Sequence, residues 1–224
     1  MVFLLKQWKT ILVYQEEDVA NYYRMNKKIK EVIEATSLAS ISDDRKEVLQ
    51  VLINFIKKKY ESDSTIRLNF ICTHNSRRSQ FTQVWAKLAA EIHGITIDTF
   101  SGGVEVTACN PLTVASLKRF GFEISHEGEV NPEYRVSFNK EKQPILLSSK
   151  LFDDEQNPSS EFAAVMTCSH ADENCPFVTG CEERISLRYD DPKAFDGTPM
   201  ESTFYDYRSF QIASEMIYVF SKIN

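Results

Sequence analysis

Residues 67–93 decide the fold, and they read RLNFI, then CTHNSRRS, then QFTQVWAKLAAEIH. The first five are mostly apolar, which predicts a short buried strand over Arg67–Ile71. After the polar loop, apolar side chains recur at helical spacing, which predicts a helix from about Arg78 to His93 with Gly94 as its C-cap. A strand that passes through a short loop into a helix is the unit from which parallel α/β sheets are built.

Further apolar runs complete the sheet. They predict three more strands, over Thr96–Phe100, Phe162–Thr167 and Ile185–Tyr189. A second crossover helix has Asn110 as its N-cap and Pro111 at its first position, and it ends at Gly121. We also predict a hairpin within residues 131–160 and a C-terminal helix over about 202–222. The chain is therefore expected to fold as an α/β protein with four parallel strands and helical crossovers.

The first 65 residues differ from the rest, being rich in Lys, Glu and aliphatic residues and almost free of Gly and Pro. They predict an α-helical extension over residues 1–65, followed by the main domain over residues 66–224. One helix is expected from about Asp43 to Tyr60, with Ser42 or Asp43 as its N-cap, and a shorter one over 26–35. One face of this extension is expected to dock on the main domain.

Composition limits the class of protein. Hydrophobic residues make up 42% and charged residues 26% of the 224 residues, a balance typical of folded globular proteins. A net charge of -6 argues against binding of nucleic acid. The apolar stretches near the start are too short to span a bilayer and lack a signal-peptide cleavage pattern. Five cysteines, an odd number in a chain of this length, favour reduced thiols. We expect a cytoplasmic protein with no nucleic-acid partner and no membrane partner.

The polar loop combines Cys72, Arg78 and Ser79 in the spacing Cys-x5-Arg-Ser. Backbone N–H groups in a short loop that enters a helix N-terminus bind anions, and the same positive potential stabilises a thiolate. Arg78 offers a planar fork of donors to two oxygens of a tetrahedral anion, and the Ser79 hydroxyl can donate to the sulfur. Asn75 tolerates a left-handed backbone. These residues predict a nucleophilic Cys72 that attacks a phosphate-like oxyanion; the alternative is a buried cysteine next to an unrelated arginine.

This loop resembles that of the low molecular weight protein tyrosine phosphatases and of the thioredoxin-coupled arsenate reductases that share their fold. Their loop commonly reads Cys-x-Gly-Asn-x-Cys-Arg-Ser. Asn75, Arg78 and Ser79 match it, whereas His74 replaces the usual glycine and Arg77 the usual second cysteine. The resemblance covers roughly residues 67–224 and implies a three-layer α/β/α fold. It also implies that a set of residues binds the oxyanion or supports the loop, namely Thr73, His74, Asn75, Ser76, Arg77, Ser79 and Ser101.

The sequence Tyr189-Asp190-Asp191-Pro192 resembles the acid loop of the same family, in which the Asp before Pro protonates the leaving group. The resemblance therefore assigns Asp191 as the general acid. A positioned carboxylic acid is needed because an alkoxide or phenolate leaves far better once it has received a proton. Without Cys72, an ordinary Asp-Pro turn would be an equally good interpretation.

Two more cysteines suggest redox chemistry. Cys168 follows the predicted strand Phe162–Thr167, at the strand end where open α/β sheets carry their sites, and Cys175 lies seven residues later. The core Ala-Asp-x-Asn-Cys-Pro resembles the redox segment of the thioredoxin-coupled arsenate reductases, which ordinary phosphatases of the family lack. The resemblance implies a relay in which Cys72 attacks arsenate and Cys168 attacks Cys72, releasing arsenite. Cys175 then attacks Cys168, and a thioredoxin-like protein reduces the resulting disulfide.

Several alternatives remain open. One alternative is a tyrosine phosphatase that acts on phosphotyrosine or aryl phosphates. A second is that Cys168 and Cys175 are only structural. A third is a redox sensor that uses the fold without turnover. A zinc site is a further alternative, although its spacing matches no common zinc knuckle; its ligands would be Cys168, His170, Cys175 and Cys181. We expect no metal ligands and no tightly bound cofactor, but an external thiol reductant. The resemblance also allows an alkali cation near Asn75 and Ser101.

Overall fold

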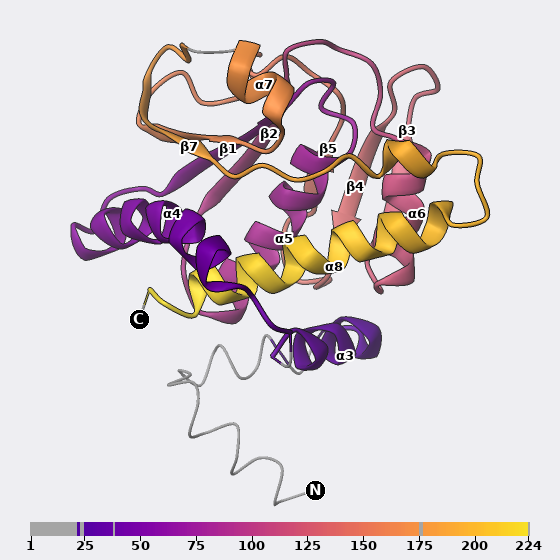
Figure 1. Ribbon diagram of the computed structural model, residues 1–224, viewed down its shortest axis with the longest axis horizontal. Helices are drawn as coiled ribbons and strands as arrows, with labels where there is room; N and C mark the ends of the chain where they lie inside the picture. The colour runs from indigo at the N-terminus through magenta and orange to yellow at the C-terminus, as the bar shows by residue number, and fades with distance from the viewer. Residues whose placement is uncertain (1–21, 23–24, 38, 175–176, 224) are drawn as a thin grey trace, which may run out of the picture.

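The computed structural model describes residues 22, 25–37, 39–174 and 177–223 (Figure 1). A parallel sheet lies at its centre, with the strand order β2-β1-β6-β7. The four strands are β1 (Arg67–Cys72), β2 (Asp98–Gly103), β6 (Phe162–Met166) and β7 (Cys181–Ser186). The predicted α/β fold with a four-stranded parallel sheet is confirmed. The two inner strands, β1 and β6, are buried along almost their whole length, as expected of a parallel sheet covered on both faces.

The predicted bounds are displaced at the two edge strands. β2 spans Asp98–Gly103 rather than Thr96–Phe100, and β7 spans Cys181–Ser186 rather than Ile185–Tyr189. Ile185, Leu187 and Tyr189 are all buried, so the apolar pattern marked the buried part of this segment correctly. The ladder with β6 nevertheless starts at Cys181, because the open side of an edge strand readily carries polar residues and therefore lacks an apolar signal.

One face of the sheet is covered by a layer of two long helices, α5 (Arg78–Ile92) and α8 (Glu201–Phe220), against which the shorter α6 (Pro111–Arg119) packs. Trp85 of α5 is fully buried in this layer and donates from Nε1 to Ser209 Oγ of α8 at 2.9 Å. The predicted start of α6 is confirmed, since the Asn110 side chain accepts a hydrogen bond from Leu112 N and Pro111 follows it. The helix layer thus fixes α5, whose first turn lies next to the end of β1.

The other face of the sheet is covered by shorter pieces. They include the short helix α7 (Ser169–Asn174) and the segment around Phe152, which pack on side chains of β1 and β6 such as Ile71 and Met166. Cys72 and Cys168 belong to this second, smaller apolar cluster. Two of the predicted catalytic thiols therefore lie on the same side of the sheet.

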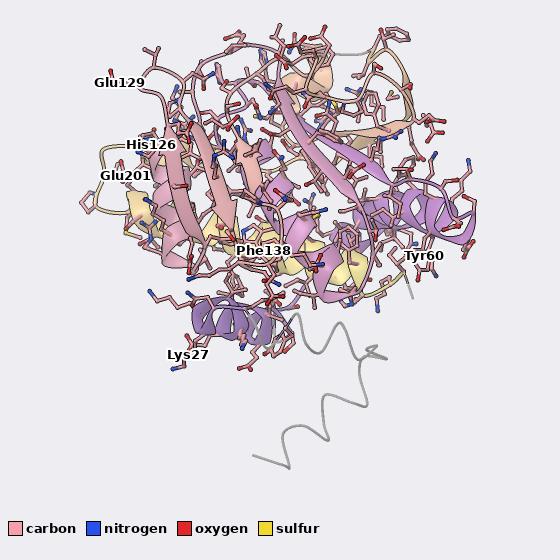
Figure 2. The ribbon with its side chains drawn as sticks, turned by 180° about the vertical axis from the view of Figure 1, so that it is seen from behind. Lys27, Tyr60, His126, Glu129, Phe138 and Glu201 are labelled. Atoms are coloured by element: carbon pink, nitrogen blue, oxygen red, sulfur yellow. The ribbon has the colours of Figure 1, made fainter. Side chains whose placement is uncertain are left out.

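A second sheet is antiparallel and consists of β3 (Glu123–Glu127), β4 (Glu133–Ser137) and β5 (Ile145–Leu147). The predicted hairpin within residues 131–160 is confirmed as β4 and β5. The strand β3 was not predicted, because four of its five residues are exposed and it shows no apolar alternation. Seen from behind, this sheet, marked by His126 and Phe138, lies above the helix that carries Lys27 (Figure 2).

The N-terminal helices are α3 (Lys27–Thr36) and α4 (Asp43–Glu61), and both were predicted. Ser42 caps α4 by accepting a hydrogen bond from Arg45 N. α3 packs against Gly121, whose φ of +103° favours glycine and where a Cβ would lie 2.8 Å from Lys28 Cβ. The apolar residues of both helices belong to the same core as the sheet and α8. The division at residue 65 remains a prediction. None of the helices in the described ranges is both long enough and apolar enough to cross a membrane.

Candidate active site

The loop Cys72–Ser79 connects β1 to α5 at the carboxyl end of the sheet. Cys72 is the last residue of β1, its side chain is buried, and its Sγ lies 3.1 Å from the hydroxyl oxygen of Ser79. Because α5 begins at Arg78, the free N–H groups of its first turn and the positive end of its dipole lie at this loop. The arrangement places the Cys72 sulfur beside N–H groups of the kind that bind anions.

Asn75 shapes this loop. Its backbone has a φ of +45°, which asparagine adopts at less cost than most residues. Its Nδ2 donates to Ser79 Oγ at 2.9 Å, and its Oδ1 accepts from Lys150 N at 3.1 Å. Gly103 of β2 lies against the loop, and a Cβ there would be 2.7 Å from Asn75 N. Only glycine allows β2 and the loop to approach this closely.

Arg78 and Asp191 lie together. Arg78 Nη2 donates to Asp191 Oδ2 at 2.6 Å, and Nη1 donates to the carbonyl of Tyr189 at 3.2 Å. The buried Arg78 Nε has no hydrogen-bond partner among the described residues, so it remains available to an oxyanion. Asp191 Oδ1 accepts from Lys193 N at 3.0 Å and thereby caps the 3-10 helix η1 (Pro192–Phe195). An oxyanion that takes both arms of the guanidinium must therefore displace the Asp191 carboxylate.

Arg77, which replaces the cysteine usual at its position, points toward the acid-loop side of the site. Its Nε donates to Tyr205 Oη at 2.6 Å and lies 3.9 Å from Asp191 Oδ1, while Nη2 donates to Asp196 Oδ2 at 3.2 Å. Burial alone would lower the pKa of Arg77, but Tyr205 and the two carboxylates outweigh it and raise that pKa. Arg77 thus places a second fixed positive charge beside Asp191.

The other predicted loop residues have mixed roles. The backbone carbonyl of His74 accepts from Ser149 Oγ at 2.8 Å, and its ring Nε2 lies 3.4 Å from Glu105 Oε2 at the surface. Ser76 Oγ donates to the carbonyl of Ala108 at 2.7 Å. Both contacts brace the outer side of the loop.

Ser101 was expected to support the loop, yet its buried hydroxyl donates to Gln83 Oε1 of α5 at 2.6 Å. Asn75 Oδ1, the second oxygen proposed for an alkali cation, already accepts from Lys150 N. An alkali cation near these two side chains stays a prediction.

Cys168 lies at the end of β6 and is fully buried. Its Sγ lies 3.5 Å from Thr73 Oγ1, the residue that follows Cys72, and accepts from Ala171 N at 3.3 Å. The structure therefore brings Cys168 to the edge of the Cys72 loop. Cys175, the third predicted thiol, lies outside the described residues.

No helix was predicted directly after Cys168, but the segment that follows it forms the helix α7. Asp172 fixes this helix to β7 and the residues after it, with oxygens 2.6 Å from Arg184 Nη2 and 2.6 Å from Arg188 Nε. Burial alone would raise the pKa of Asp172, but a hydrogen bond from Ser186 and the two arginines outweigh it and lower that pKa. A charged Asp172 therefore holds α7 in place.

Cys109 and Cys181 have no predicted role, although Cys109 is close enough to Arg77 and Cys72 for their charges to affect its thiol. Burial raises the pKa of Cys109 to about 12, so it is a neutral thiol at physiological pH, and burial also raises the pKa of the half-buried Cys181. Within the described residues, no group of three or more His, Cys, Asp and Glu side chains is placed to hold a metal ion. One ligand of the zinc alternative, Cys175, lies outside those residues.

Several residues without a predicted role also position the loop. Gln80 is fully buried on α5, and its Nε2 donates to the carbonyls of Asn75 at 2.8 Å and Ser148 at 2.9 Å. The next two residues also hold the loop, since Ser149 Oγ donates to the carbonyl of His74 and Lys150 N donates to Asn75 Oδ1. The one sequence signal for these residues is a polar side chain, Gln80, on the buried face of a predicted helix.

Comparison of the sequence with known proteins identifies relatives of this chain. No family model matches the chain. The arsenate reductase of Halalkalibacterium halodurans is 29% identical over 132 residues, which cover 59% of this chain and 78% of that protein. Arsenate reductase 2 of Staphylococcus epidermidis is 32% identical over 123 residues, which cover 55% of this chain and 76% of that protein.

Two solved structures also align with the chain. A low molecular weight phosphotyrosine phosphatase of Vibrio cholerae has a TM-score of 0.47 at 11% identity, covering 68% of this chain and 92% of its own. An arsenate reductase in a phosphate-binding state has a TM-score of 0.45 at 18% identity, covering 71% of this chain and 100% of its own. Because the match to the staphylococcal protein reaches 32% identity over three quarters of that protein, this chain belongs to the arsenate reductase family.

Proposed function

We propose that the protein is a cysteine-dependent arsenate reductase in which Cys72 is the nucleophile and Cys168 the second thiol. The observation that carries this proposal is the position of the buried Cys168 beside the Cys72 loop, with its sulfur 3.5 Å from Thr73 Oγ1. A phosphatase of this fold needs only a nucleophile, an arginine and an acid. A second thiol beside the first serves a redox step instead.

The first step is binding and attack. Arsenate enters the cradle formed by the loop N–H groups and the Arg78 guanidinium, and it displaces the Asp191 carboxylate. The Cys72 thiolate forms a bond to arsenic while one arsenate oxygen leaves as water. Ser79, 3.1 Å from the sulfur, stabilises the thiolate before attack. Once displaced from Arg78, Asp191 takes up a proton from solvent and gives it to the departing oxygen.

The second step moves electrons. The Cys168 thiolate attacks the Cys72 sulfur, the sulfur–arsenic bond breaks, and its electron pair stays on arsenic. Arsenic is thereby reduced by two electrons and leaves as arsenite, while the two thiols become a disulfide. Cys175 then attacks Cys168, which restores the Cys72 thiolate. A thioredoxin-like dithiol reduces the resulting Cys168–Cys175 disulfide, so the enzyme needs no tightly bound cofactor and operates in a reducing compartment such as the cytoplasm.

Phosphatase activity is the second candidate function, and the contact between Asp191 and Arg78 favours it as a side reaction. With an aryl phosphate, Cys72 would form a thiophosphate that water hydrolyses, because phosphorus is not reduced under these conditions. Asp191 would protonate the phenolate as it leaves. The substrates therefore range over tetrahedral oxyanions and their monoesters.

One experiment separates the two functions. Arsenate reduction, with thioredoxin and its reductase supplied, and aryl phosphate hydrolysis are measured side by side in the parent protein, Cys168→Ser and Cys181→Ser. We expect Cys168→Ser to lose arsenate turnover and keep aryl phosphate hydrolysis, whereas Cys181→Ser keeps both. Absence of arsenate turnover in the parent protein, or its retention in Cys168→Ser, would refute the relay.

A further inference from the structure

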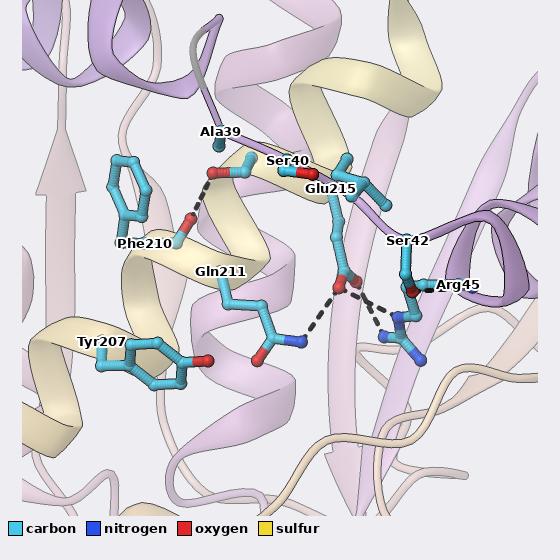
Figure 3. A pocket seen from close by; sticks show the side chains of 10 residues that line it. Ala39, Ser40, Ser42, Arg45, Tyr207, Phe210, Gln211 and Glu215 are labelled. Atoms are coloured by element: carbon cyan, nitrogen blue, oxygen red, sulfur yellow. Dashed lines mark hydrogen bonds and ion pairs between the residues drawn. The ribbon is translucent and has the colours of Figure 1, made fainter.

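A buried ion pair joins the N-terminal helix α4 to the C-terminal helix α8. Arg45 Nε donates to Glu215 Oε1 at 2.9 Å, and Arg45 Nη2 donates to Glu215 Oε2 at 2.7 Å. The Glu215 side chain is 3% exposed and that of Arg45 is 20% exposed. Figure 3 shows the paired side chains, with Gln211 donating to the same carboxylate at 3.0 Å. Two hydrogen bonds between one guanidinium and one carboxylate fix the relative position of both groups.

The same pair holds Tyr189. The Tyr189 hydroxyl donates to Glu215 Oε2 at 2.7 Å, and the Arg45 guanidinium lies 4.8 Å from the centroid of the Tyr189 ring. Arg45 Nη1 also donates to the carbonyl of Arg188 at 3.2 Å. Burial and the Glu215 carboxylate raise the pKa of Tyr189 well above its usual value, so its hydroxyl stays a donor. Residues of α4 and α8 thus contact the ring of Tyr189, its hydroxyl and the peptide that precedes it.

Tyr189 leads directly into the active site. Its carbonyl accepts from Arg78 Nη1 at 3.2 Å, and Asp191, two residues further on, accepts from Arg78 Nη2 at 2.6 Å. The side chain between them, Asp190, is 98% exposed. Tyr189 is therefore the buried anchor of the segment that carries the acid.

We propose that Arg45 and Glu215 are positioning residues for the reaction, because they fix Tyr189 and through it the Arg78 fork and the Asp191 carboxylate. The inference rests on the proposed function and deepens it. It assigns α4, which precedes the sheet in the sequence, a part in building the acid side of the active site. Arg45 contacts neither Cys72 nor Asp191 in the described structure, so its influence passes through Tyr189.

The test compares two pairs of substitutions in the full chain. Arg45→Met combined with Glu215→Gln removes both charges, so that no buried carboxylate is left unpaired. Arg119→Gln combined with Asp206→Asn is the control, because it removes another arginine–carboxylate pair that ties α8 to a neighbouring helix, with an Arg119 Nη2 to Asp206 Oδ1 distance of 2.7 Å. Tyr189→Phe is a milder third variant, since it removes only the hydroxyl that binds Glu215.

The first readout is hydrolysis of two aryl phosphates that differ in their leaving groups. Phenyl phosphate releases a basic phenolate that needs a proton, whereas para-nitrophenyl phosphate releases a weakly basic one. We expect the Arg45/Glu215 pair variant to lose about tenfold more activity on phenyl phosphate than on para-nitrophenyl phosphate, because a displaced Asp191 weakens proton transfer. The control variant should keep the parent ratio of the two rates. An unchanged ratio in the Arg45/Glu215 variant would overturn the proposal.

The second readout does not depend on turnover. Amide hydrogen exchange of the peptide covering residues 187–196 should become faster in the Arg45/Glu215 variant and in Tyr189→Phe, but not in the control. Unchanged exchange in that peptide would overturn the proposal even in an active enzyme. A parent protein that turns over neither arsenate nor aryl phosphates would refute the proposed function, and the exchange data would still decide whether Arg45 holds the acid segment.

Discussion

Replacing Asn75 by alanine tests how the loop is held. Asn75 is fully buried, and its side chain makes the two hydrogen bonds that link the loop to Ser79 and to the backbone of Lys150. Its φ of +45° also lies in a region that alanine adopts at a cost. The substitution therefore removes the two contacts and strains the backbone.

The expected cost follows from these contacts. Each buried hydrogen bond contributes about 0.5–1.5 kcal/mol, and the Lys150 N–H left without its acceptor costs about 1 kcal/mol more. The left-handed backbone adds about 1 kcal/mol for alanine relative to asparagine. We expect Asn75→Ala to lower the free energy of unfolding by about 3–5 kcal/mol, measured by urea denaturation.

The same substitution should slow the chemistry of Cys72. Asn75 Nδ2 donates to Ser79 Oγ, which leaves the Ser79 hydroxyl hydrogen free to point at the Cys72 sulfur. A hydrogen bond to a charged group contributes about 1.5–3 kcal/mol. Partial loss of the bond from Ser79 to the Cys72 thiolate is therefore expected to slow alkylation of Cys72 by iodoacetamide at neutral pH about tenfold. Mass spectrometry of the Cys72 peptide gives this rate.

Asn157→Ala is the matched control. Asn157 is another buried asparagine, and its Nδ2 donates to three carbonyls outside the loop, those of Ser101, Leu151 and Phe152. It should lose stability without slowing the alkylation of Cys72. The reasoning is refuted if Asn75→Ala loses less than about 1 kcal/mol, or if both variants slow alkylation equally.

Three further outcomes are expected. Asp191→Ala should lower aryl phosphate hydrolysis by about 10²-fold or more and tighten phosphate binding in competition assays, because Arg78 Nη2 is freed; weaker phosphate binding would contradict this. Burial lowers the pKa of His93 from 6.5 to about 4, so the unfolded chain takes up this proton at a higher pH than the folded chain. As the pH falls from 6.5 to about 4, up to about 3 kcal/mol of the free energy of unfolding is therefore lost. His93→Gln should flatten that part of the pH dependence of unfolding, and an unchanged slope would count against the assignment. Gly103→Ala should abolish phosphate protection of Cys72 against alkylation, since its Cβ would collide with Asn75 N; full protection would show that the loop adapts.

The parts of the fold that were predicted correctly depend on local signals. Caps such as Ser42 and Asn110 and the apolar spacing of α5 and α8 act within a few residues, so they can be found in the sequence. The strand β3 could not be predicted in this way, because its exposed side chains leave only backbone pairing with β4 to define it. The start of β7 was wrong for the same reason.

In the candidate site, too, the residues that are close in the sequence could be predicted and their distant partners could not. Cys72, Ser79 and Arg78 are close in sequence, and their proximity follows from one strand, one loop and one helix. The partners that hold them come from distant parts of the chain, such as the backbone of Lys150 and the carbonyl of Tyr189. Backbone atoms carry no residue-specific signal, so tertiary packing alone determines these contacts.

The N-terminal helices share one apolar core with the sheet, and this makes the rest of the chain depend on them for its stability. α4 alone contributes five buried apolar side chains, namely Leu49, Leu52, Ile53, Phe55 and Ile56. At about 1.5–3 kcal/mol each, their burial amounts to roughly 10 kcal/mol, comparable with the whole stability of a typical domain. Removal of α4 would expose the apolar side chains that pack against it here, so the rest of the chain is expected to be unstable without it.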